Sequence, residues 1–337
     1  MQEAFGRTAS YFSAQGKLLP KGTVFLMLHR IVDTVPFSAD RSLYMTCKTF
    51  ENLIIYLLEQ GIQILSLNDW LENLIENERV CIITFDDGWA DNFENAFPIL
   101  RKYSVPATIF LTTGFLDTTE MFWFEKIRSL FERSRSNQDA GNALLTAIER
   151  ATSLVRFKTR SLDSNSLPLL LEALKDCHPD VIQEVIREAA VNGLTIENDD
   201  RIVLSYDEIN EMGKHGITFG SHGASHSILT WLSSAEKFNE ISLSKAALER
   251  TGVNLCPAFS FPNGLFDPES LDMVRASGYK AAFAASIRNI GKAACPFLYS
   301  RVCFSESVCS SRDLLAYRLL KVRLRGEAVR EQTHFFD

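Results

Sequence analysis

Two adjacent carboxylates end an apolar run in the segment VCIITFDDGWADN, residues 80–92. Successive side chains of a strand point to opposite faces, so Asp86 and Asp87 can take different roles where that strand ends. One carboxylate can bind a metal ion while its neighbour takes a proton from a water molecule. The alternative for a DDG sequence is an ordinary turn or helix cap.

Two histidines follow another apolar run, in SHGASH, where His222 and His226 are four residues apart. In a compact loop this spacing can bring both imidazoles to one side of a metal, and a carboxylate completes a facial set of two histidines and one aspartate. Zinc is the ion that such ligands favour. The alternative is a pair of surface loop histidines, but two of the six histidines in the chain lie at this one strand end.

Polar residues end two further apolar runs. His29 follows VFLML, and the turn FPNG follows PAFS. The reacting groups of a (β/α) barrel project from the carboxyl ends of its strands, so all of these residues would meet if the fold is a barrel.

The elements around these residues alternate between short apolar runs and segments of helical periodicity, which is typical of a mainly parallel sheet with crossover helices. A helix is predicted at 48–61, after the first strand. No GxGxxG or GxxxxGK[ST] sequence follows a strand, which argues against a nucleotide-binding sheet. We therefore predict an α/β fold with a (β/α) barrel of seven or eight strands. The predicted strands are 23–29, 62–66, 80–86, 107–112, 217–222, 257–262, 279–285 and 297–302.

Between residues 117 and 201 the pattern is helical alone, so we predict a helical insertion, 117–201, within a single catalytic barrel domain that spans 1–337. The insertion contains no metal-binding spacing, and its one histidine is His178. We expect it to pack over one rim of the barrel and to contribute to substrate choice. The helix that follows it begins with Ser205 and Glu208 at capping-box spacing.

The composition is that of a globular protein, with 46% hydrophobic and 23% charged residues. A net charge of −7 and the lack of any basic run disfavour nucleic-acid and anionic-membrane partners. The polar N-terminal residues lack the apolar core of a signal peptide, and no apolar run reaches the ~18 residues of a transmembrane helix, so we expect a cytoplasmic protein. Seven cysteines without a CxxC pair argue against a disulfide framework and a structural zinc site.

The two motifs TFDDGWADN and GSHGASH together resemble the first two motifs of the polysaccharide deacetylases, the NodB-homology family also called carbohydrate esterase family four. Order and context agree as well, because PILRKYSVPATIFLTTGFL resembles the segment after the first motif and FPNGLFD resembles the turn of the third. The resemblance covers residues 23–115 and 204–302 and leaves out the insertion. It implies a distorted (β/α) barrel that removes N- or O-acetyl groups from sugars with a divalent metal ion.

Carried over by position, the resemblance makes Asp86 the catalytic base and makes Asp87, His222 and His226 the ligands of one divalent ion. Zinc is the expected ion, with cobalt, nickel and manganese as alternatives. A backbone N–H near Asn263 would lie where the family places a donor to the oxyanion.

Two features of the family are missing from their usual places. Many members have an arginine that pairs with the base at the start of the third motif, where this chain has Ser260, and Arg301 in YSRV is our candidate for that role, with a surface arginine as the alternative. The late LxxH motif, whose histidine is the general acid, is also absent. A subset of the family carries this motif ahead of the first one, and LMLHR resembles it. His29 is therefore the predicted general acid, with a buried structural histidine as the alternative reading and His334 or water as substitute acids.

Aromatic residues near the motifs can border a sugar site, because aromatic faces suit the apolar face of a pyranose. On this ground Trp89 and Trp231 are predicted to bind substrate. Phe122, Trp123 and Phe124 in the insertion have the same potential, although an aromatic stripe at helical spacing is more often helix core.

The predicted function is a metal-dependent deacetylase that acts on an N-acetylated amino sugar or on its nucleotide-linked or lipid-linked precursor. Two alternatives stay open: a superfamily relative that hydrolyses a non-sugar amide, and a carbohydrate-binding protein that has lost catalysis. An intact set of base and ligands disfavours the second, because a pure binder has no need of Asp86. The sequence leaves open the sugar, its carrier, the preference for N- or O-acetyl groups and the oligomeric state.

Overall fold

The computed structural model describes most of the chain between residues 22 and 309. The described residues are 22–36, 40–73, 79–135, 138–151, 166–196, 201–284 and 297–309. The N-terminal residues that led to the cytoplasmic prediction lie outside this part of the chain, as does His334.

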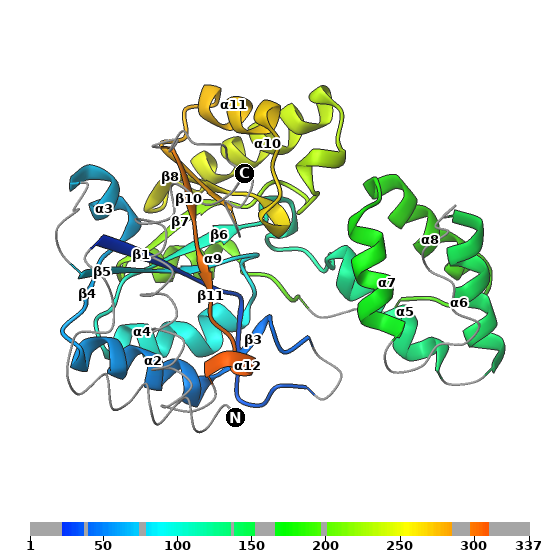
Figure 1. The fold of residues 1–337 in the computed structure, drawn as a ribbon, viewed down its shortest axis with the longest axis horizontal. Helices are drawn as coiled ribbons and strands as arrows, with labels where there is room; N and C mark the ends of the chain where they lie inside the picture. The colour runs from blue at the N-terminus through cyan, green and yellow to red at the C-terminus, as the bar shows by residue number, and fades with distance from the viewer. Residues whose placement is uncertain are drawn as a thin grey trace, which may run out of the picture.

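A nine-stranded parallel sheet curls into a nearly closed barrel with helices around it (Figure 1). The strand order is β10-β9-β8-β7-β6-β5-β1-β11, and the short β4 pairs with the start of β5. The predicted barrel class is therefore what the chain forms. The strands are β1 (Gly22–Leu28), β4 (Gln63–Ile64), β5 (Arg79–Phe85), β6 (Ala107–Leu111), β7 (Ile217–Ser221), β8 (Leu255–Ser260), β9 (Ala281–Ala284), β10 (Leu298–Ser300) and β11 (Val302–Cys303).

The barrel closes through the last two strands. β10 pairs with β9 at one end of the strand order, β11 pairs with β1 at the other end, and only Arg301 separates β10 from β11. The single strand predicted at 297–302 is therefore two short strands, because the segment changes partner at Arg301. This position puts Arg301 at the seam of the barrel.

Amphipathic helices cover the outside of the barrel. In α2, Phe50, Leu53 and Ile54 recur at helical spacing and are buried against the sheet. The capping box predicted at the start of α9 is confirmed, with reciprocal hydrogen bonds between Ser205 and Glu208. None of the helices in the described part of the chain has both the length and the hydrophobicity that crossing a bilayer requires. The barrel helices are α2 (Cys47–Glu59), α3 (Leu67–Asn73), α4 (Phe97–Lys102), α9 (Tyr206–Gly213), α10 (Ser234–Thr251), α11 (Pro268–Ala276) and α12 (Glu306–Cys309).

Single helical turns and a small second sheet follow the carboxyl ends of the barrel strands. Because parallel strands end at the same edge of a sheet, these segments together form the mouth of the barrel. In the small sheet, β2 (Arg30–Val32) pairs in parallel with β3 (Tyr44–Thr46). The turns are η1 (Asn92–Ala96), η2 (Thr113–Phe115), η3 (Leu229–Trp231) and η4 (Pro262–Gly264).

The described residues between β6 and α9 form a helical unit with its own apolar core, at the right of Figure 1. Leu130, Leu144, Leu170 and Val185, one from each helix, are fully buried in this core. The core of the unit is therefore separate from that of the barrel. The division into one catalytic domain with an insertion at 117–201 stays a prediction. The helices are α5 (Trp123–Ser134), α6 (Gln138–Ala151), α7 (Ser166–Lys175) and α8 (Pro179–Val191).

Candidate metal centre and active site

Strand alternation points several of the predicted residues into the interior of the barrel at its mouth. Inside the barrel, Phe25, Ile82, Phe110 and Ala258 pack in one cluster with Phe283. A Cβ atom on Gly220 would come within 2.7 Å of the Phe110 ring, so β7 also faces this interior. Side chains an even number of positions further along these strands point the same way. They are His29 after β1, Thr84 and Asp86 at the end of β5, His222 after β7 and Ser260 at the end of β8.

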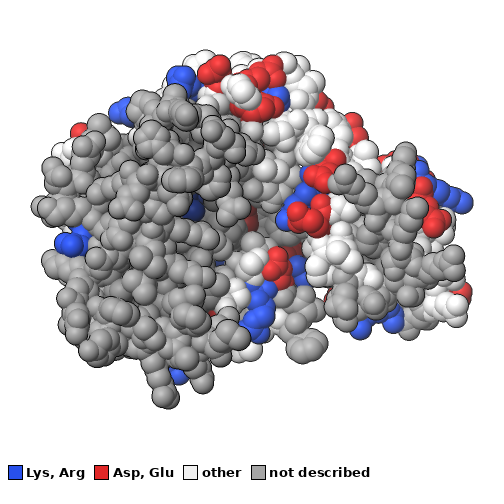
Figure 2. Space-filling view, in the orientation of Figure 1, with Lys and Arg blue, Asp and Glu red and all other residues white. Residues whose placement is uncertain are grey.

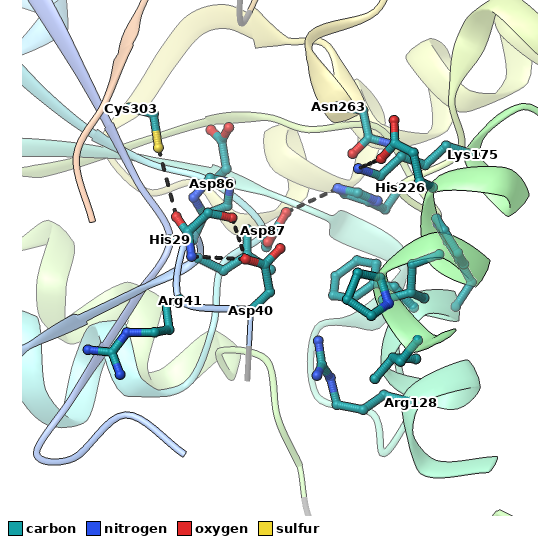
Figure 3. A pocket seen from close by; sticks show the side chains of 18 of the residues that line it. His29, Asp40, Arg41, Asp86, Asp87, Arg128, Lys175, His226, Asn263 and Cys303 are labelled. Atoms are coloured by element: carbon teal, nitrogen blue, oxygen red, sulfur yellow. Dashed lines mark hydrogen bonds and ion pairs between the residues drawn. The ribbon is translucent and has the colours of Figure 1, made fainter. Parts of the chain in front are cut away.

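Asp87, His222 and His226 form a cluster of candidate metal ligands. Asp87 Oδ1 lies 3.4 Å from His222 Nε2 and 3.2 Å from His226 Nε2, and all three residues are buried (Figure 3). Two atoms that each bind a tetrahedral zinc ion at about 2.0–2.1 Å lie about 3.3–3.4 Å apart, so both spacings suit such an ion. Among the described residues this is the only group of His, Cys, Asp and Glu side chains close enough to share a metal.

Hydrogen bonds orient Asp87 and His222 toward the centre of the cluster. Trp89 Nε1 donates to Asp87 Oδ2 over 2.8 Å, while the buried Asp87 Oδ1 has no hydrogen-bond partner among the described residues. The Ser260 carbonyl lies 2.7 Å from His222 Nδ1, so Nδ1 carries the proton and Nε2 faces Asp87 as a metal ligand would. A buried carboxylate oxygen without a partner is costly unless a cation binds it. The residues present therefore fit a divalent ion.

Three residues of the site have left-handed backbone conformation. The φ angle is 73° at Asp87, 62° at His226 and 55° at Asn263. Such a conformation costs a non-glycine residue of order 1 kcal/mol, and this strain gathers at functional sites. The Thr112 N–H donates to the Asp87 carbonyl and fixes the strained turn against β6. The turn directs Asp87 to the histidines, whereas Asp86 stays inside the barrel.

The charges around the cluster favour a cation. Burial alone would raise the pKa of Asp87, but the close imidazoles of His222 and His226 hold that pKa well below its usual range. Burial likewise opposes protonation of His222, yet Asp86 and then Asp87 hold the pKa of this imidazole above its usual value. Both shifts have one origin, since the buried carboxylates and imidazoles lie close together and each favours the charged form of the other.

Arg301 binds Asp86 from the seam of the barrel. Its Nη1 donates to Asp86 Oδ1 over 2.7 Å and its Nη2 donates to Oδ2 over 2.6 Å. The same guanidinium donates to the hydroxyls of Thr84 and Ser260. Burial would raise the pKa of Asp86, but Arg301 and then His222 lower it below its usual value, so this carboxylate is ionised at neutral pH. The structure thus places Arg301 where the sequence predicted a partner for the base.

His29 lies beside Asp86 at the mouth. The register of β1 with β5 sets Leu28 opposite Phe85, and the Asp86 N–H donates to the Leu28 carbonyl, so the residues that follow the two strands are neighbours. His29 and Asp86 line the same cavity. Burial lowers the pKa of His29 although the carboxylates of Asp87 and Asp86 oppose this shift, and the ring is therefore mostly neutral at pH 7.

Asp91 and Asn92, in the second half of the first motif, fix the backbone that carries His29. Asn92 Nδ2 donates to the His29 carbonyl over 2.8 Å, and Asp91 Oδ2 pairs with Arg30 Nε at 2.7 Å. The Arg30 guanidinium also lies over the Trp89 ring, 4.3 Å from its centroid. Sequence reasoning missed these contacts. The polar residues of WADN after the DDG turn were the available signal.

A cavity of about 680 Å³ opens over the ligand cluster (Figure 3). Helices α5 and α7 of the insertion form one wall of it, with Trp123, Phe124 and Arg128 on α5. Phe124 also packs edge-on against the His226 ring, with 5.7 Å between the ring centroids. Figure 2 shows the surface hollowed between the barrel and the insertion, with charged side chains along the rim. The barrel residues that line the cavity include His29, Asp86, Asp87, His222, His226 and Asn263.

The insertion supplies this wall but none of the candidate ligands. Its histidine, His178, is the N-cap of α8, where Nδ1 accepts a hydrogen bond from the Asp180 N–H. His178 is not part of the ligand cluster in the described residues. The expectation that the insertion carries no metal chemistry stays a prediction.

The aromatic residues predicted at the substrate site lie in different places. Trp123 and Phe124 line the cavity, whereas Phe122 is fully buried. Trp89 is also fully buried, so its predicted contact with substrate is wrong, and its indole supports the ligand cluster from behind. Trp231 is 42% exposed and is not among the described residues that line the cavity, so its predicted contact with substrate stays a prediction.

The family model of the polysaccharide deacetylases matches residues 74–282, which is more than half of the chain. The chain therefore belongs to the polysaccharide deacetylase family. This family consists of hydrolases that act on the amide bonds of acetylated sugars and generally depend on a metal ion.

Known proteins resemble the chain in sequence or in fold. The Bacillus subtilis (strain 168) protein YxkH, which carries the polysaccharide deacetylase name, is 35% identical over 96 residues. The match covers 27% of this chain and 32% of YxkH, so it spans about a third of that relative. The Streptococcus pyogenes deacetylase PplD, solved in complex with acetate, matches 90% of this chain and 99% of its own with a TM-score of 0.55 and 18% identity. IcaB of Ammonifex degensii matches 89% of this chain and 98% of its own with a TM-score of 0.52 and 16% identity. These two likenesses confirm the fold.

Proposed function

We propose that the chain is a metal-dependent deacetylase that hydrolyses the acetyl amide of an N-acetylated amino sugar. The observation that supports this best is that ligand atoms of Asp87, His222 and His226 meet beside the Asp86–Arg301 pair in one cavity. A carbohydrate-binding protein without catalysis would have no use for an ionised, buried carboxylate next to a metal cluster.

One divalent ion would be held by Asp87 Oδ1 and by the Nε2 atoms of His222 and His226. Two nitrogen ligands and one oxygen ligand favour zinc, with cobalt, nickel and manganese as alternatives. When bound, such an ion polarises an acyl carbonyl and makes a water molecule more acidic.

Asp86 is the proposed acceptor of the proton from the attacking water. Each of its oxygens accepts one hydrogen bond from Arg301, and a carboxylate oxygen has a second lone pair that can take a proton. Arg301 keeps Asp86 ionised at neutral pH, so the base is ready before substrate binds. The water oxygen then forms its bond to the acetyl carbon as its proton passes to Asp86.

His29 is the proposed donor of a proton to the leaving amine. As the C–N bond breaks, the ring gives a proton to the sugar nitrogen, and the products are acetate and a free amino sugar. The lowered pKa of His29 makes its protonated ring a stronger acid, although fewer rings carry that proton at neutral pH. A backbone N–H near Asn263, on the turn η4 that lines the cavity, is the proposed donor to the oxyanion.

The cavity suits a sugar that carries a further group. Its volume of about 680 Å³ lies within the range of roughly 300–1,000 Å³ that holds drug-sized ligands. On the insertion wall, Trp123 and Phe124 offer apolar faces, while Arg128 and Lys175 offer cations. We propose an amino sugar linked to a nucleotide or lipid carrier as the substrate, and the cytoplasm as the place of reaction.

Acetate release tests this function. The purified full chain, loaded with zinc, should release acetate from an N-acetylated amino sugar, lose the activity on chelation and regain it when zinc is restored. The comparison substrate is a non-sugar acetamide, such as an acetylated lysine side chain. Cleavage of that acetamide alone would support the non-sugar amidohydrolase instead, and zinc binding without any acetate release would support the silent binding protein.

A further inference from the structure

The loop of residues 222–226, which carries both candidate histidine ligands, is held on one side by the turn after β6. The N–H groups of Thr113 and Gly114 donate to the carbonyls of Gly223 and Ala224 over 3.2 and 2.8 Å. A Cβ atom on Gly114 would come within 2.6 Å of the Ala224 carbonyl oxygen, so this close approach requires glycine. These bonds satisfy carbonyls of the loop and leave its N–H groups to other partners.

The other side of the loop rests on one carboxylate from outside the barrel. Glu240, on α10, accepts from the N–H groups of Ala224 and Ser225 through Oε2, each over 2.9 Å. Its Oε1 accepts from the Ser225 hydroxyl over 2.7 Å. The same Oε2 would lie 3.1 Å from a Cβ atom on Gly223, so the loop backbone lies directly against the carboxylate. Three polar groups of the loop thus converge on a single side chain.

We propose that Glu240 is a positioning residue that sets the backbone of the 222–226 loop and thereby places His226 for metal binding. The proposal rests on the metal site of the proposed function. Nothing in the sequence motif points to Glu240, because it lies on a helix 14 residues beyond His226.

The two histidines differ in how their rings are held, and this difference makes Glu240 matter. His222 Nδ1 is fixed by the carbonyl of Ser260 at 2.7 Å. His226 Nδ1 is buried and has no hydrogen-bond partner among the described residues, and its backbone has a φ angle of 62°. The His226 ring therefore relies on its backbone for its position more than His222 does, and Glu240 holds that backbone.

The expected effect is a loss of metal affinity without a loss of fold. Removing a partner that orients a metal-binding histidine typically weakens metal affinity 10- to 100-fold. Glu240 acts on His226 through the backbone, so we expect a loss of about 10-fold, at the lower end of that range. The barrel core should be unaffected because Glu240 lies on the outer helix.

Zinc affinity, measured by competition with a chelating indicator on the full chain, tests the proposal. Glu240→Ala should bind zinc about 10-fold more weakly than the natural protein. Glu240→Gln should bind almost normally, since its amide oxygen can still accept from both N–H groups. Glu249→Ala is the matched control, because it removes an exposed carboxylate of the same helix whose partner is Lys245 at 3.7 Å.

Amide hydrogen exchange of the metal-free protein gives a readout that is independent of zinc. The Ala224 and Ser225 amides should exchange faster in Glu240→Ala and at the natural rate in Glu249→Ala. Unchanged zinc affinity and unchanged exchange in Glu240→Ala would overturn the proposal. If Glu240→Ala fails to fold, Glu240→Asp replaces it, because its side chain is one methylene shorter. Glu240→Asp should then bind zinc more weakly and exchange the two amides faster than the natural protein, by smaller factors. If the natural protein binds no zinc, the proposed function fails, while the exchange rates still decide whether Glu240 holds the loop.

Discussion

The barrel mouth and the insertion wall face each other across one cavity, but they are built in different ways. Mouth residues follow buried parallel strands, so strand register decides which polar groups meet, as His29 and Asp86 do after β1 and β5. Wall residues such as Trp123 and Arg128 lie on helices whose apolar core is separate from the barrel. The contrast teaches that the proposed chemistry sits on rigid strand ends, while the proposed recognition depends on how a second unit docks.

The largest expected effect comes from the mouth. Asp86→Asn removes the proposed proton acceptor and should lower kcat at least ~10²-fold while the zinc content stays the same. Acetate release and metal analysis on the same sample measure both quantities. Activity close to that of the natural protein would show that Asp86 is not the base.

Asp86→Asn also leaves the buried Arg301 without its counter-charge, which should cost roughly 3–5 kcal/mol of unfolding free energy. The double variant with Arg301→Met removes the unpaired charge and should recover much of that stability without recovering turnover. Urea unfolding of the two variants separates loss of the base from loss of the fold.

The second effect concerns the proton donor at the mouth. His29→Ala should lower turnover of an amide substrate by about 10²-fold and spare metal binding. The loss should be smaller for an ester, because an alkoxide leaves with less need of a proton than an amine does. Rates on matched N-acetyl and O-acetyl sugars measure this difference. Equal losses on the two substrates would exclude His29 as the general acid.

The third effect is on stability and depends on pH. Because the pKa of Asp86 is held below its usual value, the pair with Arg301 stabilises the fold fully above a pH of about 4 and loses that contribution as pH falls through the lower folded pKa. Arg301→Met should therefore destabilise the metal-free protein most at neutral pH, and the difference should shrink in acid. Urea unfolding at pH 7 and pH 3 in chelator checks this, and a difference that grows in acid would contradict it.

The smallest effect belongs to the insertion wall. Trp123→Ala should raise KM by about 2- to 10-fold, the scale of one aromatic contact, and leave kcat unchanged. Trp231→Ala is the control, because this tryptophan is exposed outside the cavity. Steady-state kinetics on one sugar substrate compare the two variants. Equal changes in both would mean that the wall does not select the substrate.

More of the barrel mouth than of the insertion wall could be predicted from the sequence, for a physical reason. Side chains of a strand alternate between its two faces, and parallel strands end at the same edge of a sheet. Residues as distant in sequence as His29, Asp86 and His222 could therefore be grouped before the structure was known. Arg301 could be named as a partner of Asp86 from the sequence. The seam of the barrel that places Arg301 beside Asp86 could not be predicted, because no residue pattern marks the point at which a segment changes its partner strand.

Tertiary packing decided what the sequence could not. Trp89 and Trp231 have the same chemistry, yet one is fully buried behind Asp87 and the other is exposed away from the cavity. Helical periodicity showed that the insertion has a buried face, but it carries no information on which of its residues face the barrel. The role of Glu240 could not be predicted for the same reason. Carboxylates are common on helix surfaces, and only the structure shows which loop groups this one binds.

Metal content of the natural protein and of His222→Ala tests the central claim most directly. The natural protein should contain about one divalent ion per chain and His222→Ala none, because the two remaining ligands rarely hold zinc. His215→Ala, which removes an exposed histidine outside the ligand cluster, should keep its metal. Acetate release should disappear together with the ion. An unchanged metal content in His222→Ala would contradict the site formed by Asp87, His222 and His226.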